Sequence, residues 1–167
     1  MRRTASAHRS WRLALAGVMG LWLSGCGFHL QGQVELPRSL ANARIEANDE
    51  QSDFYSALRA SLTAAGTRFD GPEGGAATIR ILEDSSSERI LTVSARNTPT
   101  AFSLAYKIKV AVEYQGKVLL PAEEHTVTRE YSFDETELLA KQRESDILRQ
   151  ALADDLAALI MHRLAAL

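Results

Sequence analysis

The chain has 167 residues, of which 46% are hydrophobic and 24% charged, and a formal net charge of −2. This mildly acidic balance argues against broad nucleic-acid binding, which requires a basic surface. Because Cys26 is the single cysteine, the sequence also excludes a disulfide framework, a cysteine-based zinc site and a redox pair.

Residues 1–25 have the layout of a secretory signal. The first 12 residues are positively charged through Arg2, Arg3, Arg9 and Arg12, and an apolar run follows from 13 to 23. This run of 11 residues is well short of the roughly 20 that span a bilayer, which argues against the alternative of a transmembrane helix followed by a free thiol. The segment is therefore predicted to be a cleaved leader.

The end of this segment, Leu23-Ser24-Gly25-Cys26, resembles the bacterial lipobox. In a lipobox the cysteine thiol receives a diacylglycerol, the chain is cut before the cysteine, and the new amine is acylated. Two or more acyl chains hold a protein firmly at a membrane, whereas one holds it only marginally. We therefore expect a lipid anchor on Cys26 and a mature chain of 142 residues, whose 15 basic and 21 acidic residues give a net charge of −6.

The first part of the mature chain predicts a lead, a strand and a helix. Residues 26–41 contain Gly27, Gly32 and Pro37 with little periodicity, and we interpret them as an extended lipidated lead. A short strand is predicted over 43–47. A helix follows, which begins after Ser52 or Asp53 as its N-cap, ends at Gly66, and has four apolar residues on one face: Phe54, Leu58, Leu62 and Ala65.

Strands dominate the middle of the chain. After the loop 71–75, a strand over 78–82 is predicted, and the sequence leaves open whether it continues to Val93. Residues 103–114 alternate apolar and polar side chains, which is typical of a strand with one buried face. Gln115-Gly116 is predicted to be a turn, and 118–133 to return as an antiparallel strand in which Pro121 lies at an edge or bulge.

The last 34 residues predict one long helix. Asp134 and Glu137 resemble a capping box, and no proline or glycine follows. An apolar stripe then marks the buried face: Leu138, Leu148, Leu152, Leu156, Leu159, Ile160 and Leu164. The fold class predicted for 42–167 is α+β, as a two-layer sandwich with an approximately four-stranded, mostly antiparallel sheet and two helices on one face.

Few residues suggest catalysis. The histidines of the mature chain, His29, His125 and His162, have no second His or Cys at ligand spacing, so no metal site and no cofactor is expected besides the lipid on Cys26. The doublets Glu123-Glu124 and Asp154-Asp155 are typical of surface charge, because sequence neighbours on a strand or helix do not converge on one reacting centre. The sequence therefore favours a protein that is not an enzyme.

Basic residues are the candidates for ligand binding. Lys107 and Lys109 are two apart on the alternating strand, so they share one face and are placed to meet one anionic ligand together. Arg89 and Arg96 lie between the two strand blocks, and Lys141 begins the closing helix. The alternative for each residue is a charge that only solvates an open face of the sheet.

The opening Cys26-Gly27-Phe28-His29-Leu30 resembles that of the LptE family of lipopolysaccharide-assembly lipoproteins. The similarity continues through the chain in order and spacing. It includes Ala65-Gly66, Ala95-Arg96-Asn97, the strand from Tyr106 to Tyr114, the segment 129–134, and Leu139-Ala140-Lys141. One departure is Thr98-Pro99, which stands where the family pattern leads us to expect a glycine turn.

The resemblance implies a place and a set of partners. LptE proteins sit as a plug in the β-barrel protein LptD, in a 1:1 complex that moves lipopolysaccharide to the outer leaflet, and they support assembly of the barrel. Gly27 after Cys26, in place of an aspartate that retains lipoproteins in the inner membrane, fits the outer membrane. The family's lipopolysaccharide contacts fall here on Arg96 and Lys141, with Lys107 and Lys109 as further candidates.

Two other function classes remain open from the sequence. One is a lipoprotein that serves as a periplasmic scaffold and binds only protein partners. The other is an enzyme such as a cell-wall hydrolase, which activity dependent on His125 or on the acidic doublets would support.

Overall fold

The computed structural model of the chain describes residues 35–71, 75–132 and 138–167, with side chains throughout except at 138–141. The elements are η1 (Arg38–Leu40), β1 (Ala43–Ala47), α2 (Asp53–Ala64), β2 (Ala77–Val93), β3 (Pro99–Tyr114), β4 (Lys117–Ser132) and α3 (Leu138–Ala165). The leader, Cys26 with the four residues after it, and the Asp134–Glu137 pair lie outside the described residues.

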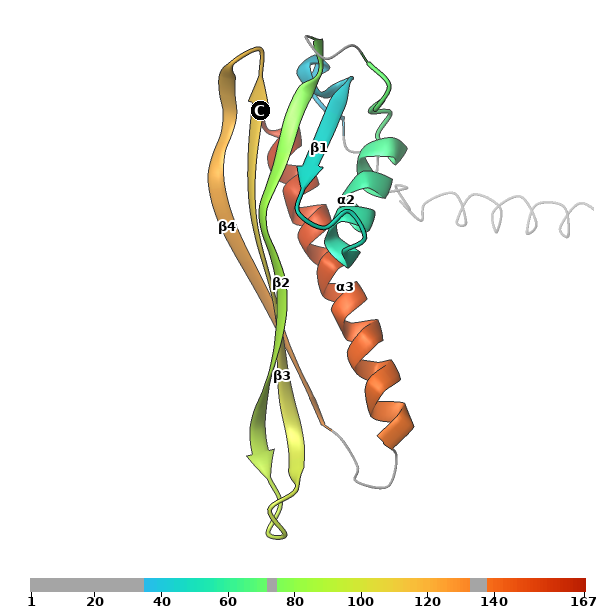
Figure 1. The fold of residues 1–167 in the computed structure, drawn as a ribbon, viewed down its shortest axis with the longest axis vertical. Helices are drawn as coiled ribbons and strands as arrows, with labels where there is room; N and C mark the ends of the chain where they lie inside the picture. Colours follow the sequence, from blue (N-terminus) through green and yellow to red (C-terminus); the bar gives the residue numbers. More distant parts are fainter. Residues whose placement is uncertain (1–34, 72–74, 133–137) are drawn as a thin grey trace, which may run out of the picture. The chain divides into compact units, whose positions relative to one another are not determined.

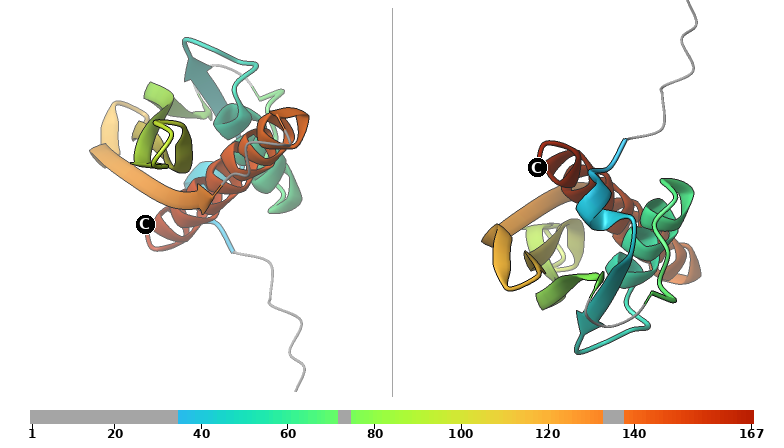
Figure 2. Two further views of the ribbon diagram at one scale, coloured as in Figure 1. Left: turned by 90° about the horizontal axis from the view of Figure 1, so that it is seen from below. Right: turned by 90° about the horizontal axis from the view of Figure 1, so that it is seen from above.

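Four strands form one sheet in the order β1-β2-β3-β4, and α2 and α3 cover one of its faces (Figures 1 and 2). β1 runs parallel to β2, with α2 as the crossover between them, and the other two strand pairs are antiparallel. The α+β sandwich predicted from the sequence is confirmed. The sheet is mixed because it contains one parallel pair, β1 and β2, beside two antiparallel pairs. A parallel pair requires a crossover connection, and α2 supplies it.

β3 supplies the centre of the core. Its inward side chains alternate along the strand, and each is at most 5% exposed: Phe102, Leu104, Tyr106, Ile108, Val110 and Val112. The strand begins at Pro99, four residues before the predicted start, because Ala101 and Phe102 still pair with β4. The turn predicted at Gln115-Gly116 is confirmed, and both residues have positive φ angles, of 50° and 75°.

β2 is a single strand of 17 residues, which answers the question that the sequence left open. Its register with β3 shifts between Ile81 and Glu83, so Leu82 leaves the alternation. Beyond this bulge Asp84 lies opposite Ile108, and Glu88 lies opposite Leu104. Carboxylates therefore occupy the inward face of β2 where hydrophobic residues occupy it before the bulge.

α2 begins and ends as the sequence predicts. Ser52 is the N-cap, and its side-chain oxygen accepts a hydrogen bond of 3.0 Å from the backbone N–H of Tyr55. Gly66 follows the helix with a φ of 89°, a conformation that side chains other than glycine adopt at a cost. The segment expected as an extended lead contains the short helix η1, whose Leu40 is fully buried, so the core includes residues before 42.

α3 has two different halves. From Leu152 onward its buried stripe packs against the sheet and α2 through Leu152, Ala153, Leu156, Ala157, Ile160, Met161 and Leu164. From 142 to 150 no side chain is buried, and only Ser145, Leu148 and Arg149 are half-buried. Since each fully buried leucine contributes about 1.5–3 kcal/mol, the second half of the helix provides most of its attachment.

These differences divide the domain into two regions. The packed half comprises β1, α2, the first five residues of β2 (77–81), β3 from Tyr106, β4 as far as Val127, and α3 from Leu152. The distal half comprises β2 from Glu83, the turn 94–98, β3 as far as Ala105, β4 from Thr128, and α3 as far as Gln150. β1 covers only the first five residues of β2, so the rest of β2 is an edge strand of the sheet (Figure 1).

Candidate functional site

Arg96 lies in the turn that joins β2 to β3. The backbone N–H of Ser94 donates to the carbonyl of Thr98 at 2.7 Å, and that of Asn97 donates to the carbonyl of Ser94 at 2.9 Å. Asn97 has a φ of 63°, the left-handed conformation that asparagine tolerates better than most residues. Asn97 therefore adopts the left-handed conformation for which a glycine was expected. The turn closes tightly, and Thr98-Pro99 follows it in the sequence.

Lys141 belongs to the first turns of α3, and only its backbone is among the described parts of the chain. The start of α3 and the β2–β3 turn lie at the same end of the domain (Figure 1). The fold thus places the backbone positions of Arg96 and Lys141 in the distal half, although 44 residues separate them in the sequence.

Lys107 and Lys109 share the outward face of β3, as predicted, but they lie among carboxylates. Lys107 Nζ is 2.5 Å from a carboxylate oxygen of Glu83, and this hydrogen bond raises the pKa of Lys107. Lys109 is in register with Glu83 on one side and with Glu124 on the other. An anion at these lysines has to compete with carboxylates already in place, which makes them weak candidates for the site.

Two polar clusters hold the helices to the inward face of the sheet. In the first, Tyr106 Oη donates to Asp84 at 2.8 Å and accepts from the backbone N–H of Phe54 at 3.3 Å, while Ser52 Oγ donates to Asp84 at 2.5 Å. Arg149 of α3 completes this cluster through an ion pair of 2.7 Å with Asp53. Burial, together with the hydrogen bond to Asp84, raises the pKa of Tyr106 far above its ordinary value.

The second cluster lies further into the distal half. Tyr131 Oη donates to Glu88 at 2.9 Å, and Ser145 Oγ of α3 lies 3.4 Å from the same carboxylate oxygen. Burial and the hydrogen bond to Glu88 raise the pKa of Tyr131 to about 12. The Tyr131 ring stacks on Phe102, with 5.5 Å between the ring centroids.

Sequence analysis missed both clusters, because the bulge at Leu82 reverses which residues of β2 face inward. The alternation of Asp84, Ser86 and Glu88 was the available signal. Each cluster joins a carboxylate to hydroxyl groups or to a cation of a neighbouring element. These bonds connect α2 and α3 to the sheet and to each other, so the clusters are suited to holding the helices in place.

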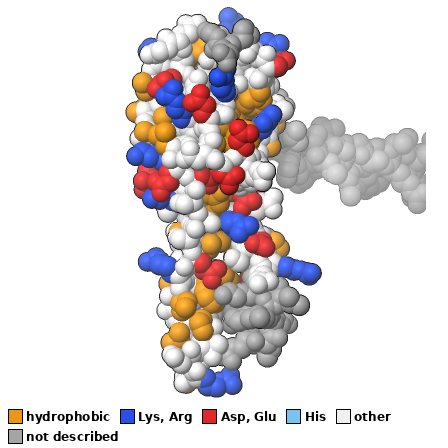
Figure 3. Space-filling view, viewed as in Figure 1, with side chains coloured by type: hydrophobic (Ala, Val, Ile, Leu, Met, Phe, Trp, Pro, Cys, Tyr) orange, Lys and Arg blue, Asp and Glu red, His pale blue; other side chains and the backbone are white. Residues whose placement is uncertain are grey.

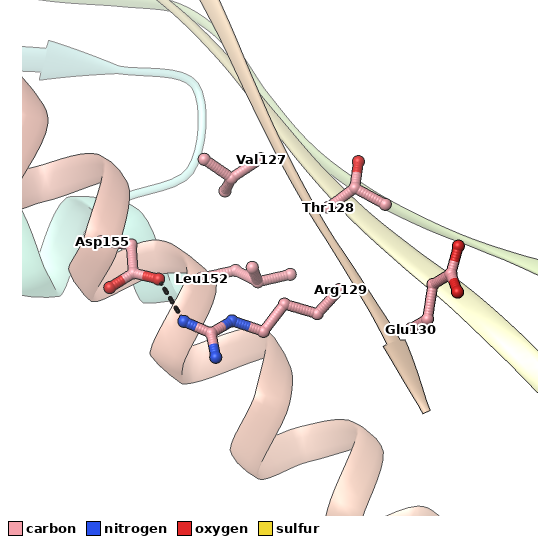
Figure 4. Close-up of a pocket in the computed structure, with 6 residues that line it drawn as sticks. All are labelled: Val127, Thr128, Arg129, Glu130, Leu152 and Asp155. Atoms are coloured by element: carbon pink, nitrogen blue, oxygen red, sulfur yellow. Dashed lines mark hydrogen bonds and ion pairs between the residues drawn. The ribbon is translucent and has the colours of Figure 1, made fainter. Parts of the chain in front are cut away.

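A shallow, open pocket of about 520 Å³ lies between β4 and α3 (Figure 4). Arg129 reaches across it to Asp155 with an ion pair of 2.8 Å, and Val127 and Leu152 form its apolar wall. Further along, Arg163 forms a bidentate pair with Glu123, which lowers the pKa of that carboxyl, and His125 lies 3.4 Å from Glu123. One carboxylate of each acidic doublet, Asp155 or Glu123, thus pairs with an arginine of a neighbouring element.

Within 35–71, 75–132 and 138–167, no three His, Cys, Asp or Glu side chains are grouped to hold a metal ion. In the same part of the chain, no helix has the length and apolar character needed to cross a bilayer.

The sheet, the two helices on one face and the cationic hairpin end define a class of small α+β domain that is found in bacterial lipoproteins. A crystal structure of the rare lipoprotein B from Shewanella oneidensis has a TM-score of 0.66 at 21% identity, over 75% of this chain and 94% of that one. The solution structure of lipoprotein B from Nitrosomonas europaea has a TM-score of 0.66 at 25% identity, over 84% of this chain and 91% of that one.

The sequence comparisons narrow this class to one family. The model of the LptE family, described as lipopolysaccharide-assembly, matches residues 40–164, so the chain belongs to the LptE family. The LPS-assembly lipoprotein LptE of Pectobacterium atrosepticum is 24% identical over 159 residues, which cover 94% of this chain and 85% of that protein. The resemblance inferred from the sequence is confirmed.

Proposed function

We propose that this chain is a non-enzymatic lipoprotein of the outer membrane that plugs the LptD β-barrel, supports its assembly and binds lipopolysaccharide in transit to the outer leaflet. The acyl groups on Cys26 anchor the chain in the inner leaflet of the outer membrane, and the domain rises into the barrel. Membership of the LptE family supports this proposal.

The observation that carries the lipopolysaccharide contact is the placement of Arg96. A tight turn presents this residue at the same end of the domain as the start of α3, where Lys141 lies. Guanidinium and ammonium groups bind phosphates through charge-assisted hydrogen bonds, and lipid A and the inner core of lipopolysaccharide bear phosphates. Lys107 and Lys109 have a secondary role, since Glu83 and Glu124 accompany them.

Charge reversal tests this contact. The double variant R96E/K141E is expected to lose most of its affinity for lipopolysaccharide at moderate salt, because two attractions become repulsions. Lys117→Glu is the matched control, since Lys117 is an exposed cation in the β3–β4 hairpin and lies outside the distal half. Equal affinity of R96E/K141E and wild type would remove Arg96 and Lys141 from the site.

Co-purification tests the plug. Extraction of the full-length protein in mild detergent is expected to recover a large β-barrel protein at equal stoichiometry. Recovery of the chain alone would contradict the plug, and recovery of other protein partners without lipopolysaccharide would favour the scaffold alternative.

A further inference from the structure

Exposed hydrophobic side chains gather at the end of β2. Ile90 is 57% exposed, Leu91 43% and Val93 54%, and we call these three residues the apolar strip. Figure 3 shows hydrophobic side chains clustered over the lower ends of β2 and β3, with a basic side chain at the tip below them. Three large apolar side chains exposed within four residues indicate a surface that another molecule covers.

The strip is open because of the way the sheet is built. β1 pairs with β2 only as far as Ile81, so the outer edge of β2 has no neighbouring strand from Glu83 onward among the described residues. The register with β3 also shifts between Ile90 and Thr92 and again between Thr92 and Val93. Leu91 consequently has no partner in register on β3, and the apolar side chains spread around the edge of the strand.

Charge at the tip of the β2–β3 hairpin is of one sign. Between Glu88 and Lys107 the charged residues of the sequence are Arg89 and Arg96. Exposed Arg89 directly precedes the strip, and Arg96 follows Val93 by three residues. The nearest carboxylate before the strip, Glu88, accepts a hydrogen bond from Tyr131 on the inward face.

An apolar strip between two guanidinium groups matches an amphiphile that carries both phosphates and hydrocarbon chains. We propose that the apolar strip binds an acyl chain of the phosphorylated glycolipid, while Arg89 and Arg96 bind its phosphates. This inference rests on the proposed lipopolysaccharide-binding function. It adds that an acyl chain of the lipid is bound and that the apolar strip binds it. Arg89 enters the site as a second phosphate ligand.

The alternative occupants fit the strip less well. A partner β-strand requires a regular edge, and the two register shifts interrupt the edge at the strip itself. A second copy of the chain would bring Arg89 and Arg96 against the same cations of its partner, which like-charge repulsion disfavours. A lipid with phosphates and flexible chains satisfies both the charge and the irregular shape.

The test compares two ligands on the full-length protein held in amphipol. One is hexa-acylated, diphosphorylated lipid A, and the other is its fully deacylated bisphosphorylated disaccharide. I90S/L91S/V93S is expected to weaken binding of lipid A at least about tenfold, because the apolar contact area is lost, and to leave binding of the deacylated disaccharide unchanged. R89Q/R96Q is expected to weaken binding of both ligands.

Val118→Ser is the matched control, because Val118 has the same exposed fraction as Val93, 54%, and lies beside the β3–β4 turn outside the distal half. Circular dichroism checks folding of each variant. Independently, benzoylphenylalanine at position 91 is expected to form a photo-crosslink with lipid A in an otherwise unchanged strip. This measurement does not depend on the stability of the triple variant.

Several outcomes would overturn the inference. The inference fails if a folded triple variant binds lipid A within twofold of wild type. It also fails if the triple variant loses the barrel partner, or a dimer, while its lipid A binding persists. In those cases wild-type binding still supports the proposed function. If the wild-type protein binds neither ligand, the lipopolysaccharide part of the proposed function fails, and the inference fails with it.

Discussion

The two halves of this domain are held together by different interactions. The packed half buries a continuous apolar core between α2, the second half of α3 and the sheet, with Phe54, Leu58, Ile79, Leu156 and Ile160 fully buried. In the distal half Ser145 of α3 forms a hydrogen bond with Glu88 of the sheet and Arg149 forms an ion pair with Asp53 of α2, while hydrophobic residues of β2 face solvent. The comparison indicates a stable packed half and a distal half that is less firmly held.

The largest expected effect is a loss of stability from a substitution in the core of the packed half. Leu156→Ala is expected to lower the free energy of unfolding by about 2–5 kcal/mol, because it leaves a cavity in a fully buried site. Ile147→Ala on the same helix, at a residue that is 66% exposed, is expected to change it by less than about 0.5 kcal/mol. Denaturant unfolding of both variants measures the difference, and similar losses would refute the division of α3 into two halves.

The next effect concerns the cluster that joins the halves. Tyr106→Phe is expected to cost about 1–3 kcal/mol, because the half-buried Asp84 carboxylate and the buried N–H of Phe54 each lose a hydrogen-bond partner. Tyr114→Phe, at a half-buried tyrosine near the opposite hairpin, serves as the control. A smaller loss for Tyr106→Phe than for Tyr114→Phe in thermal unfolding would show that the cluster contributes little.

Alkaline pH is expected to weaken the second polar cluster, which contains Tyr131 and Glu88. The pKa of Tyr131 in the folded protein is raised to about 12, whereas a tyrosine in an unfolded chain ionises near pH 10. The neutral phenol is thus favoured by folding, so its contribution is complete below about pH 10 and is lost as the pH rises through about 12.

Tyr131→Phe provides the measurement for this pH dependence. The stability difference between wild type and Tyr131→Phe is expected to shrink between about pH 10 and 12 in denaturant titrations. A constant difference across this range would mean that Tyr131 ionises alike in both states.

The smallest expected effect concerns the left-handed conformation of Asn97 in the turn between β2 and β3. Asn97→Gly is expected to leave stability within about 0.5 kcal/mol of wild type, because glycine adopts a φ of 63° readily. Asn97→Ala is expected to cost about 1 kcal/mol, since a Cβ with no polar group is strained there. Equal stabilities of the two variants would indicate that the turn does not depend on its left-handed residue.

Much of this architecture could be predicted because the patterns are local. The alternation of β3, the serine cap and apolar face of α2, and the uninterrupted closing helix each depend on residues near in sequence. The family resemblance implied the partners and singled out Arg96 and Lys141 among the basic candidates.

The rest depended on contacts between distant residues. The bulge after Ile81 set the inward direction of Asp84 and Glu88, and only the fold brought Glu83 to Lys107 and Arg149 to Asp53. Exposure of the apolar strip likewise follows from the short length of β1, which the composition of β2 does not reveal.

The role of the distal half is tested most directly by hydrogen exchange of the full-length protein with and without lipopolysaccharide. Bound ligand is expected to slow exchange of the backbone amides over 83–105 and 138–150, and to leave 54–64 and 152–164 unchanged. Slower exchange confined to the packed half, or no change at saturating ligand, would contradict a binding site at the distal end.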